Sequence, residues 1–212
     1  MGNQHKAVVL IDGENFRNYV KRVLVESGET YTDDDYNSIE LKSLINKIFL
    51  NENNVEIQQI KYYVAKISLF TESLQYSQKK ISGQRKLKMN LEKQGINFIV
   101  SGHVRRQNII VNQKTKYVFH EKGVDVGLAV DIMSQIIDKQ FDTIVLCSSD
   151  SDLQPAVKEA RKRGLSIIYL GFSINPNKGL QVTTNQTVLF RNSEIISILK
   201  QKNLNGSKSK LR

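Results

Sequence analysis

The chain has 212 residues, of which 40% are hydrophobic and 25% are charged. These values are ordinary for a folded protein and exclude a disordered or collagen-like chain. Lys and Arg number 31 against 21 Asp and Glu, which gives a net charge of +10. Such an excess favours a polyanionic partner such as nucleic acid, although solubility or an anionic membrane surface would also account for it.

Cysteine usage and hydropathy indicate the cellular compartment of the protein. The single cysteine, Cys147, lies in an apolar run, and a lone cysteine cannot form an internal disulfide. The first residues include no apolar signal region, and no apolar run is long enough to cross a bilayer. We therefore expect a cytoplasmic protein in which Cys147 is a small buried hydrophobe.

The predicted elements alternate between short apolar strands and helices of amphipathic spacing. In the first half of the chain they are a strand at 7–11, a helix at 16–25, a loop at 27–37, a helix at 39–49, a strand at 55–67 and a basic helix at 71–94. In the second half they are a strand at 96–100, a helix at 124–139, a strand at 143–147, a helix at 151–163 capped by Ser151, strands at 165–170 and 188–191, and a helix at 193–200.

Residues 102–123 have a different pattern. Two β-prone runs, 108–111 and 117–120, flank the polar turn 112–114, and this predicts an antiparallel hairpin insertion around 105–120. The rest predicts an α/β fold of the Rossmann-like kind, a mostly parallel sheet with helices on both faces. We expect one domain over 1–200, because a domain usually has about 100–200 residues, and a basic disordered tail at 201–212.

Acidic residues follow strands that are far apart in the sequence. Asp12 comes directly after the first strand, Asp150 and Asp152 follow the strand at 143–147, and Asp125 opens the helix after the hairpin. Right-handed crossovers place the carboxyl ends of parallel strands at one edge, where ligands bind. Clustered carboxylates repel unless a cation neutralises them, and oxygen ligands suit Mg²⁺ or Mn²⁺. The positions therefore predict a divalent metal site.

Each acid also has a structural explanation. Asp12 could cap the helix that follows it, Asp150 or Ser151 could cap the next, and Asp152 could favour a helix N-terminus. Capping needs one acid per helix, so Asp150 and Asp152 together exceed that need. Asp131 and Glu14 are open candidates, since Asp131 lies six residues after Asp125 and so on a different helix face.

Three segments resemble the motifs of a known family. Residues 9–16 (VLIDGENF), 122–125 (KGVD) and 148–155 (SSDSDLQP) are similar to the three motifs of the NYN domain, a family of the PIN-like nuclease superfamily that includes LabA-like proteins. The similarity spans roughly residues 6–172. It implies a Rossmann-like, PIN-like fold, dependence on Mg²⁺ or Mn²⁺, and ribonuclease activity.

The resemblance also implies roles for individual residues. The metal ligands would be Asp12, Asp125, Asp150 and Asp152. Asn15 would orient water or a phosphate, Ser148 would add a hydroxyl at the metal edge, and Lys122 would lie near the scissile phosphate. The alternatives are a hydrogen bond at the helix start for Asn15 and a solvated surface lysine for Lys122.

Basic residues outside these motifs are candidates for binding the nucleic-acid backbone. They are Arg85, Lys88, Arg105, Arg106, Lys114 and Lys116. A solvated helix face explains any one cluster equally well. Phe172, just past a strand, is a candidate for stacking on a base.

The sequence therefore predicts a divalent-metal-dependent endoribonuclease that prefers RNA to DNA. The first alternative is a non-catalytic RNA-binding or regulatory module. A phosphatase ranks last, because Glu14 stands where an enzyme that forms an aspartyl-phosphate typically has a second Asp. Since PIN-like proteins often pair, a homodimer is a further expectation of the resemblance.

Overall fold

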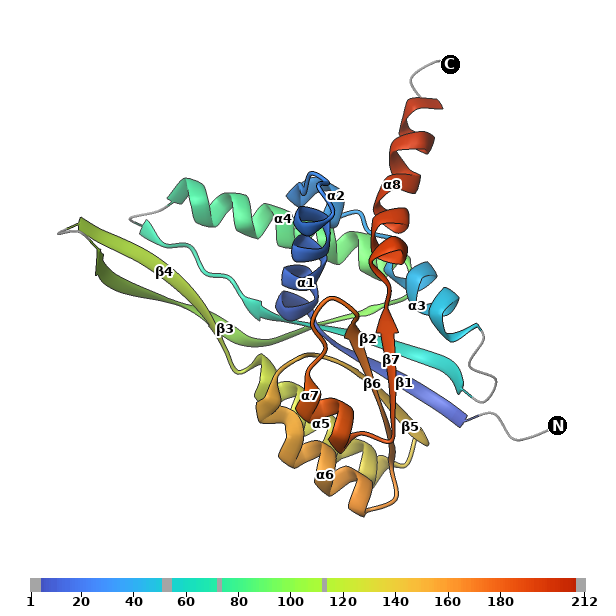
Figure 1. The fold of residues 1–212 in the computed structure, drawn as a ribbon. Helices are drawn as coiled ribbons and strands as arrows, with labels where there is room; N and C mark the ends of the chain where they lie inside the picture. The colour runs from blue at the N-terminus through green and yellow to red at the C-terminus, as the bar shows by residue number, and fades with distance from the viewer. Residues whose placement is uncertain (1–4, 51–54, 72–73, 112–113, 209–212) are drawn as a thin grey trace.

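The computed structural model describes residues 5–50, 55–71, 74–111 and 114–208, without the side chains at 108, 111, 114–116 and 201–208. Its strands form one seven-stranded sheet in the order β4-β3-β2-β1-β5-β6-β7 (Figure 1). Their bounds are β1 (His5–Asp12), β2 (Val55–Lys66), β3 (Asn97–Val111), β4 (Lys114–Lys122), β5 (Thr143–Cys147), β6 (Ser166–Phe172) and β7 (Gln186–Phe190). All neighbours pair in parallel except β3 and β4, which are antiparallel. The predicted fold class, including the hairpin, is confirmed.

Helices cover both faces of this sheet, as Figure 1 shows. They are α1 (Gly13–Glu26), α2 (Asp33–Tyr36), α3 (Leu41–Phe49), α4 (Leu74–Lys93), α5 (Val124–Asp138), α6 (Gln154–Lys162), α7 (Lys178–Thr183) and α8 (Asn192–Lys208). One core cluster joins the sheet to α1, α3, α4 and α8, and the other joins it to α5, α6 and α7.

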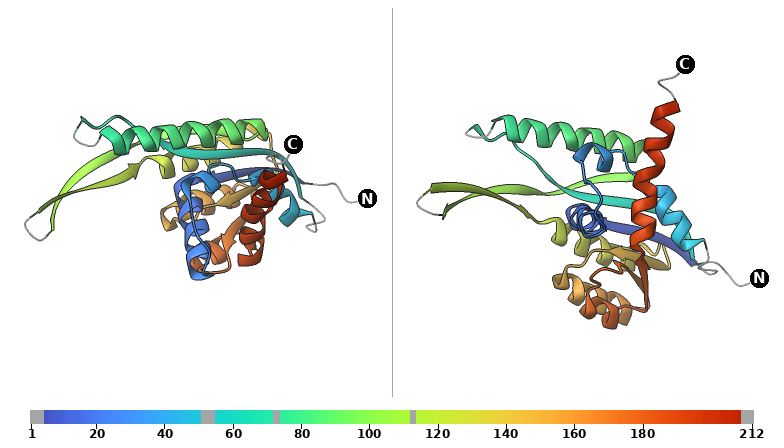
Figure 2. Two further views of the ribbon diagram at one scale, coloured as in Figure 1. Left: turned by 90° about the horizontal axis from the view of Figure 1, so that it is seen from above. Right: turned by 45° about the horizontal axis from the view of Figure 1, so that its top comes forward.

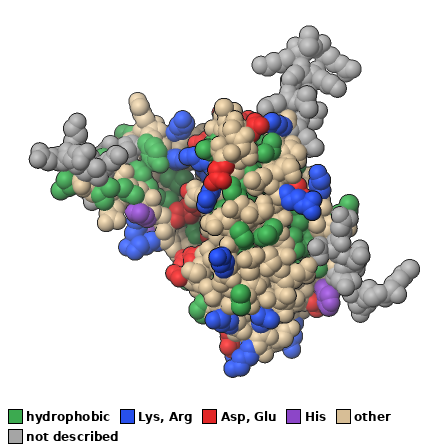
Figure 3. Space-filling view, viewed as in Figure 1, with side chains coloured by type: hydrophobic (Ala, Val, Ile, Leu, Met, Phe, Trp, Pro, Cys, Tyr) green, Lys and Arg blue, Asp and Glu red, His purple; other side chains and the backbone are tan. Residues whose placement is uncertain are grey.

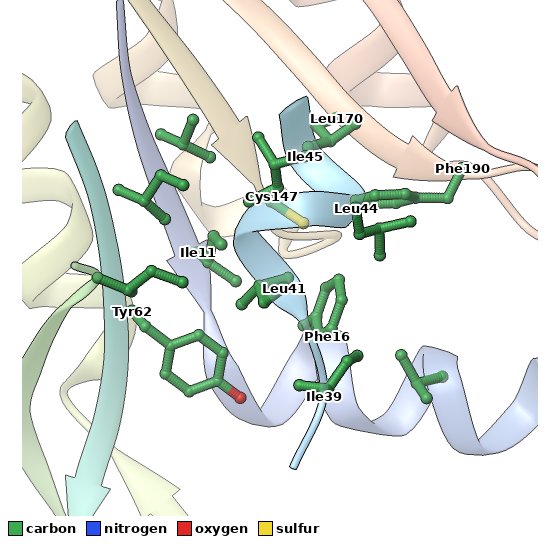
Figure 4. Packing of buried hydrophobic residues seen from close by; sticks show 14 of the residues in the cluster. Ile11, Phe16, Ile39, Leu41, Leu44, Ile45, Tyr62, Cys147, Leu170 and Phe190 are labelled. Atoms are coloured by element: carbon green, nitrogen blue, oxygen red, sulfur yellow. The ribbon is translucent and has the colours of Figure 1, made fainter. Parts of the chain in front are cut away.

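The central strands belong to both cores. Along β1, Val9 and Ile11 enter the first cluster while Val8 and Leu10 enter the second, because successive side chains point to opposite faces. A strand buried on both faces must be apolar throughout, and this explains the continuous apolar run of β1. Cys147 lies in the first cluster, as predicted (Figure 4).

The hairpin is longer than the sequence indicated. Its two strands pair from His103↔Lys122 to Val111↔Lys114, and we call this part the hairpin arm. The views in Figure 2 agree that the arm and the amino-terminal end of α4 project from the same side of the molecule. In the chain as far as the structure describes it, no helix is long and apolar enough to span a membrane.

Several elements differ from the prediction. The expected loop at 27–37 contains α2, capped by the Thr32 side chain, and α7 was not predicted. Phe172 is not a stacking residue at the site edge, because it is buried against the rings of Phe16 and Phe190. The helix α8 continues to Lys208, past its expected end at 200, while the side chains of 201–208 and all of 209–212 lie outside the described residues. The disordered tail at 201–212 stays a prediction.

Candidate active site

The strands β1 and β5 create a switch point in the sheet. They pair with each other, Ile11 opposite Cys147, yet the chain after β1 returns on one side at β2 and the chain after β5 returns on the other side at β6. In open α/β sheets, diverging connections leave a crevice outside the carboxyl ends of such strands. Asp12 and Ser148 directly follow Ile11 and Cys147, the last pair between β1 and β5.

Asp12 ends β1 and caps α1. Its Oδ1 accepts a hydrogen bond of 3.0 Å from the backbone N–H of Asn15. Its Oδ2 accepts one of 3.4 Å from the hydroxyl of Ser148, which in turn accepts one of 3.1 Å from the backbone N–H of Asp150. Ser148 is 2% exposed, so its hydroxyl does not face the solvent but links the carboxylate of Asp12 to the backbone of Asp150.

The loop after β5 is held by the same kind of contact. The side-chain oxygen of Asn15 accepts a hydrogen bond of 3.1 Å from the backbone N–H of Ser149, which ties α1 to this loop. Of the two caps that the sequence left open, Asp150 and Ser151, the structure has Asp150: its Oδ1 accepts a hydrogen bond of 2.9 Å from the backbone N–H of Asp152 at the start of a 3₁₀ turn, Ser151–Leu153. The helix α6 follows that turn.

A cleft of about 510 Å³ opens at this switch point, and we call it the acidic cleft. It is lined by Asp12, Glu14, Asn15, Asn18, Glu121, Lys122, Gly123, Val124, Asp125, Val126 and Asp150. The structure thus brings three of the four predicted ligands together from separate segments of the chain. In Figure 3, acidic side chains gather in the hollow between the hairpin arm and the rest of the molecule.

Gly123 makes the junction between the arm and α5. Its φ of 91° lies in the left-handed region, which glycine adopts without strain. This conformation lets β4 turn directly into α5, so that Lys122 and Asp125 both line the acidic cleft.

The electrostatics of the acidic cleft are strained in the absence of a cation. Burial, together with the nearby charges of Asp150 and Glu14, raises the pKa of Asp12 to about 6, although the hydrogen bonds from Asn15 and Ser148 lower it. Burial, together with the charges of Glu14 and Asp12, raises the pKa of Glu121 to about 7. A cation at this place would relieve the repulsion among these groups.

The donor set fits a hard divalent ion. All its acids are carboxylates, which Mg²⁺ and Mn²⁺ prefer. Within the described ranges, no three acidic, His or Cys side chains are arranged to hold an ion by themselves. An ion here would therefore take one or two carboxylates together with water and phosphate oxygens, the coordination typical of Mg²⁺.

Two predicted or open residues lie outside the cleft. Asp152 is exposed on the 3₁₀ turn and does not line the acidic cleft, so its role as a ligand stays a prediction. Asp131 faces elsewhere: it pairs with Lys61 Nζ at 2.9 Å and accepts a hydrogen bond from the hydroxyl of Tyr63. These contacts join α5 to β2.

The sequence of nearly the whole chain matches one family. Residues 6–190 match the family model of the NYN domain. The chain belongs to the NYN domain family. The family is nuclease-like and PIN-like, which agrees with the resemblance of the three motifs and with the fold.

Other similarities carry less weight. A 62-residue segment of this NYN domain is 32% identical to an uncharacterized protein of Methanocaldococcus jannaschii, and it covers 29% of this chain and 26% of that protein. The match thus spans about a quarter of that relative. A crystal structure of a protein of unknown function from Vibrio parahaemolyticus matches with a TM-score of 0.55 at 15% identity, over 90% of this chain and 95% of that one. That likeness supports the fold alone.

The NYN domain has one cleft acid that the sequence analysis missed. Glu121 is the penultimate residue of β4 and also accepts a hydrogen bond from the backbone of Ala65. Its position in the sequence could have indicated this place in the cleft, because Glu121 directly precedes the motif at 122–125. In a strand it shares a face with Phe119. Glu14, which the sequence left open, also lines the cleft.

A second groove adjoins the acidic cleft, and we call it the mixed-charge groove. It has a volume of about 500 Å³ and shares Glu14 and Glu121 with the cleft. Its lining has four basic residues, Arg17, Lys79, Lys80 and Lys86, and four acidic ones, Glu14, Asp33, Asp34 and Glu121. Arg17 bonds Asp33 at 2.5 Å and the hydroxyl of Tyr31 at 2.8 Å, which fixes its side chain against α2.

The predicted backbone-binding residues fall into three groups. Arg85 and Lys88 are exposed on α4 but line neither the acidic cleft nor the mixed-charge groove. On the arm, Arg105 donates to His103 at 2.8 Å and Arg106 lies 4.8 Å from the ring centroid of Tyr117. The side chains of Lys114 and Lys116 lie outside the described residues.

Proposed function

We propose that this NYN domain is a divalent-metal-dependent endoribonuclease that hydrolyses phosphodiester bonds in the acidic cleft. The observation that supports it most is the convergence of Asp12, Asp125 and Asp150 on one cleft at the switch point of the sheet. A protein with a net charge of +10 would otherwise gain little from burying Asp12 beside other acids.

In this proposal one or two carboxylates among Asp12, Asp125 and Asp150 bind Mg²⁺ or Mn²⁺ directly and the rest bind it through water, with Asp152 as a further candidate. A bound ion of this kind activates water and stabilises the charge that develops on the phosphate. Asn15 and Ser148 act as positioning residues, because their hydrogen bonds fix Ser149, Asp12 and Asp150 relative to one another.

Lys122 is the basic residue among those that line the acidic cleft. Its ammonium is exposed at the lining, where we place the scissile phosphate. The lysines of the mixed-charge groove, Lys79, Lys80 and Lys86, would contact the substrate beside the cleft, because phosphate neutralisation by lysine releases counterions from nucleic acid. An RNA rather than a DNA substrate, a cytoplasmic location and pairing of two copies are the finer parts of the proposal.

The alternative is a non-catalytic RNA-binding or regulatory NYN domain. It draws support from the caps: both Asp12 and Asp150 accept hydrogen bonds that a helix start needs, so each has a structural use without any metal. Each cap uses one carboxylate oxygen, however, and Asp125 and Glu121 cap no helix in the described part of the chain.

Cleavage of end-labelled single-stranded RNA separates the two functions. We expect the wild type to form product with Mg²⁺ or Mn²⁺ and none with chelator, and we expect Asp150→Asn to form none. The Asn oxygen can still accept the capping hydrogen bond, so the variant should keep its fold and its RNA binding. Salt-sensitive binding without product under either metal would support the non-catalytic alternative. Full activity of Asp150→Asn would contradict the proposed site.

A further inference from the structure

Three aromatic rings meet where the hairpin arm joins the amino-terminal end of α4. The ring of Phe119, from β4, lies 5.2 Å from that of Phe70 and 4.9 Å from that of Tyr76, measured between centroids. The Tyr76 and Phe119 rings are stacked, with an angle of 23° between their planes. We call Phe70, Tyr76 and Phe119 the aromatic cluster.

The aromatic cluster lies next to the acidic cleft. A cavity of about 120 Å³ is lined by all three rings and also by Glu14 and Glu121. Those two acids line the acidic cleft as well, so the cavity and the cleft are neighbours along one surface. Phe119 and Glu121 lie on the same face of β4, because they are two residues apart in a strand.

The cluster has the chemistry of a base-binding platform. Tyr76 remains 45% exposed although its ring is stacked on Phe119, so part of the ring can reach a ligand. The Nζ of Lys80, one turn further along α4, lies 5.8 Å from the centroid of the Tyr76 ring. An exposed aromatic ring with a lysine ammonium over it matches the two parts of a nucleotide, because the ring can take a flat base and the ammonium a phosphate.

We propose that the aromatic cluster stacks on one unpaired base of the strand whose neighbouring phosphate enters the acidic cleft. This rests on the proposed function and adds the substrate class: the strand is single at the cleft, because a base within a duplex has its faces covered by its neighbours. Stacking on an aromatic ring tolerates any base, so the subsite selects strandedness and not sequence.

A simpler explanation is that the rings only fasten the arm to α4. Phe70 and Phe119 are half-buried and serve such a contact well. Tyr76 serves it less well, because nearly half of its surface stays in water. Substitution of Tyr76 therefore distinguishes the two roles with little disturbance of the packing.

The test is binding to a labelled single-stranded RNA of about ten nucleotides, a length within known site sizes, measured in chelator so that cleavage plays no part. We expect Tyr76→Ala to weaken binding about tenfold, the size of one lost base-stacking contact. Tyr76→Phe keeps the ring and should bind as the wild type does. Met89→Ala, at another exposed apolar position of α4, is the control and should also bind normally.

Oligonucleotides with one abasic site, moved along the strand, locate the stacked base. The wild type should lose affinity at one position, and Tyr76→Ala should be insensitive there, because ring and base would no longer couple. Unchanged binding by Tyr76→Ala, or equal sensitivity at every abasic position, would overturn the inference. Since no metal is present, these results do not depend on whether the protein cleaves RNA.

Discussion

Replacement of Asp12 by Asn is expected to remove RNA cleavage and, at the same time, to stabilise the folded protein at about pH 8. The loss should be about a thousandfold or more, because a metal ion contributes several kcal/mol to transition-state stabilisation and each 1.4 kcal/mol is about tenfold in rate. The Asn oxygen can still accept the capping hydrogen bond from the backbone of Asn15, while the Asn amide nitrogen replaces the oxygen that accepts from the Ser148 hydroxyl.

The gain in stability follows from the raised pKa of Asp12. Between the ordinary value of 3.8 and about 6, the folded state holds a proton that the unfolded state releases. The free energy of unfolding therefore falls as the pH rises through this window and stays lower above it. Asn cannot ionise, so the variant should lose this part of the pH dependence.

Thermal unfolding in chelator measures the effect. We expect the melting temperature of Asp12→Asn to exceed that of the wild type at about pH 8, and the two to converge at about pH 4, where Asp12 is largely protonated. Added Mn²⁺ should raise the melting temperature of the wild type alone. A variant that is less stable than the wild type at the higher pH, or that still cuts RNA, would count against this account.

Gly13→Ala is expected to lower the free energy of unfolding by about 1–3 kcal/mol or more. A Cβ at this position would lie 2.4 Å from Cε1 of Tyr62 and 2.6 Å from the backbone oxygen of Tyr63. Neither can yield: Tyr62 is buried, and its hydroxyl bonds both the backbone oxygen of Gly13 at 3.0 Å and the hydroxyl of Tyr36 at 2.6 Å. Overpacking of this kind costs about 1–3 kcal/mol or more out of a total stability of about 5–15 kcal/mol.

Urea unfolding with Gly83→Ala as the control isolates this effect. Gly83 lies inside α4, and an added Cβ would meet only the end of the Asn37 side chain, at 3.3 Å. Ala is favoured over Gly within a helix by up to about 1 kcal/mol, so the control should be as stable as the wild type or more stable. If Gly13→Ala matched the wild type, the close packing of β1, α1 and β2 would be described wrongly.

The convergence of the acids could be predicted because it depends on chain order alone. The apolar runs that became β1 and β5 are short and bounded by Asp12 and Ser148, and parallel strands place such ends at one edge. The position of Asp125 followed from the same logic, since it opens a helix directly after the hairpin. Three of the four predicted ligands line the cleft as a result.

The remainder depended on contacts between distant segments. Glu121 reaches the cleft because the hairpin strands extend down to Lys122, and the sequence indicated a shorter hairpin. Phe172 looked exposed because it follows an apolar run, but β6 itself continues to this residue and buries it. Asp131 and Asp125 could be separated by helix geometry, yet the partners of Asp131 on β2 were not visible in the sequence.

The most direct test of whether acids from separate segments of the chain form one metal site is the binding of Mn²⁺. It is measured by titration calorimetry on the wild type, Asp125→Asn and Asp131→Asn. Both acids lie on α5, but only Asp125 lines the acidic cleft, while Asp131 pairs with Lys61. We predict that Asp125→Asn binds Mn²⁺ at least about tenfold more weakly than the wild type, since a ligand carboxylate is lost, and that Asp131→Asn binds it normally. Unchanged Mn²⁺ affinity in Asp125→Asn, or equal weakening in both variants, would contradict the metal site proposed here.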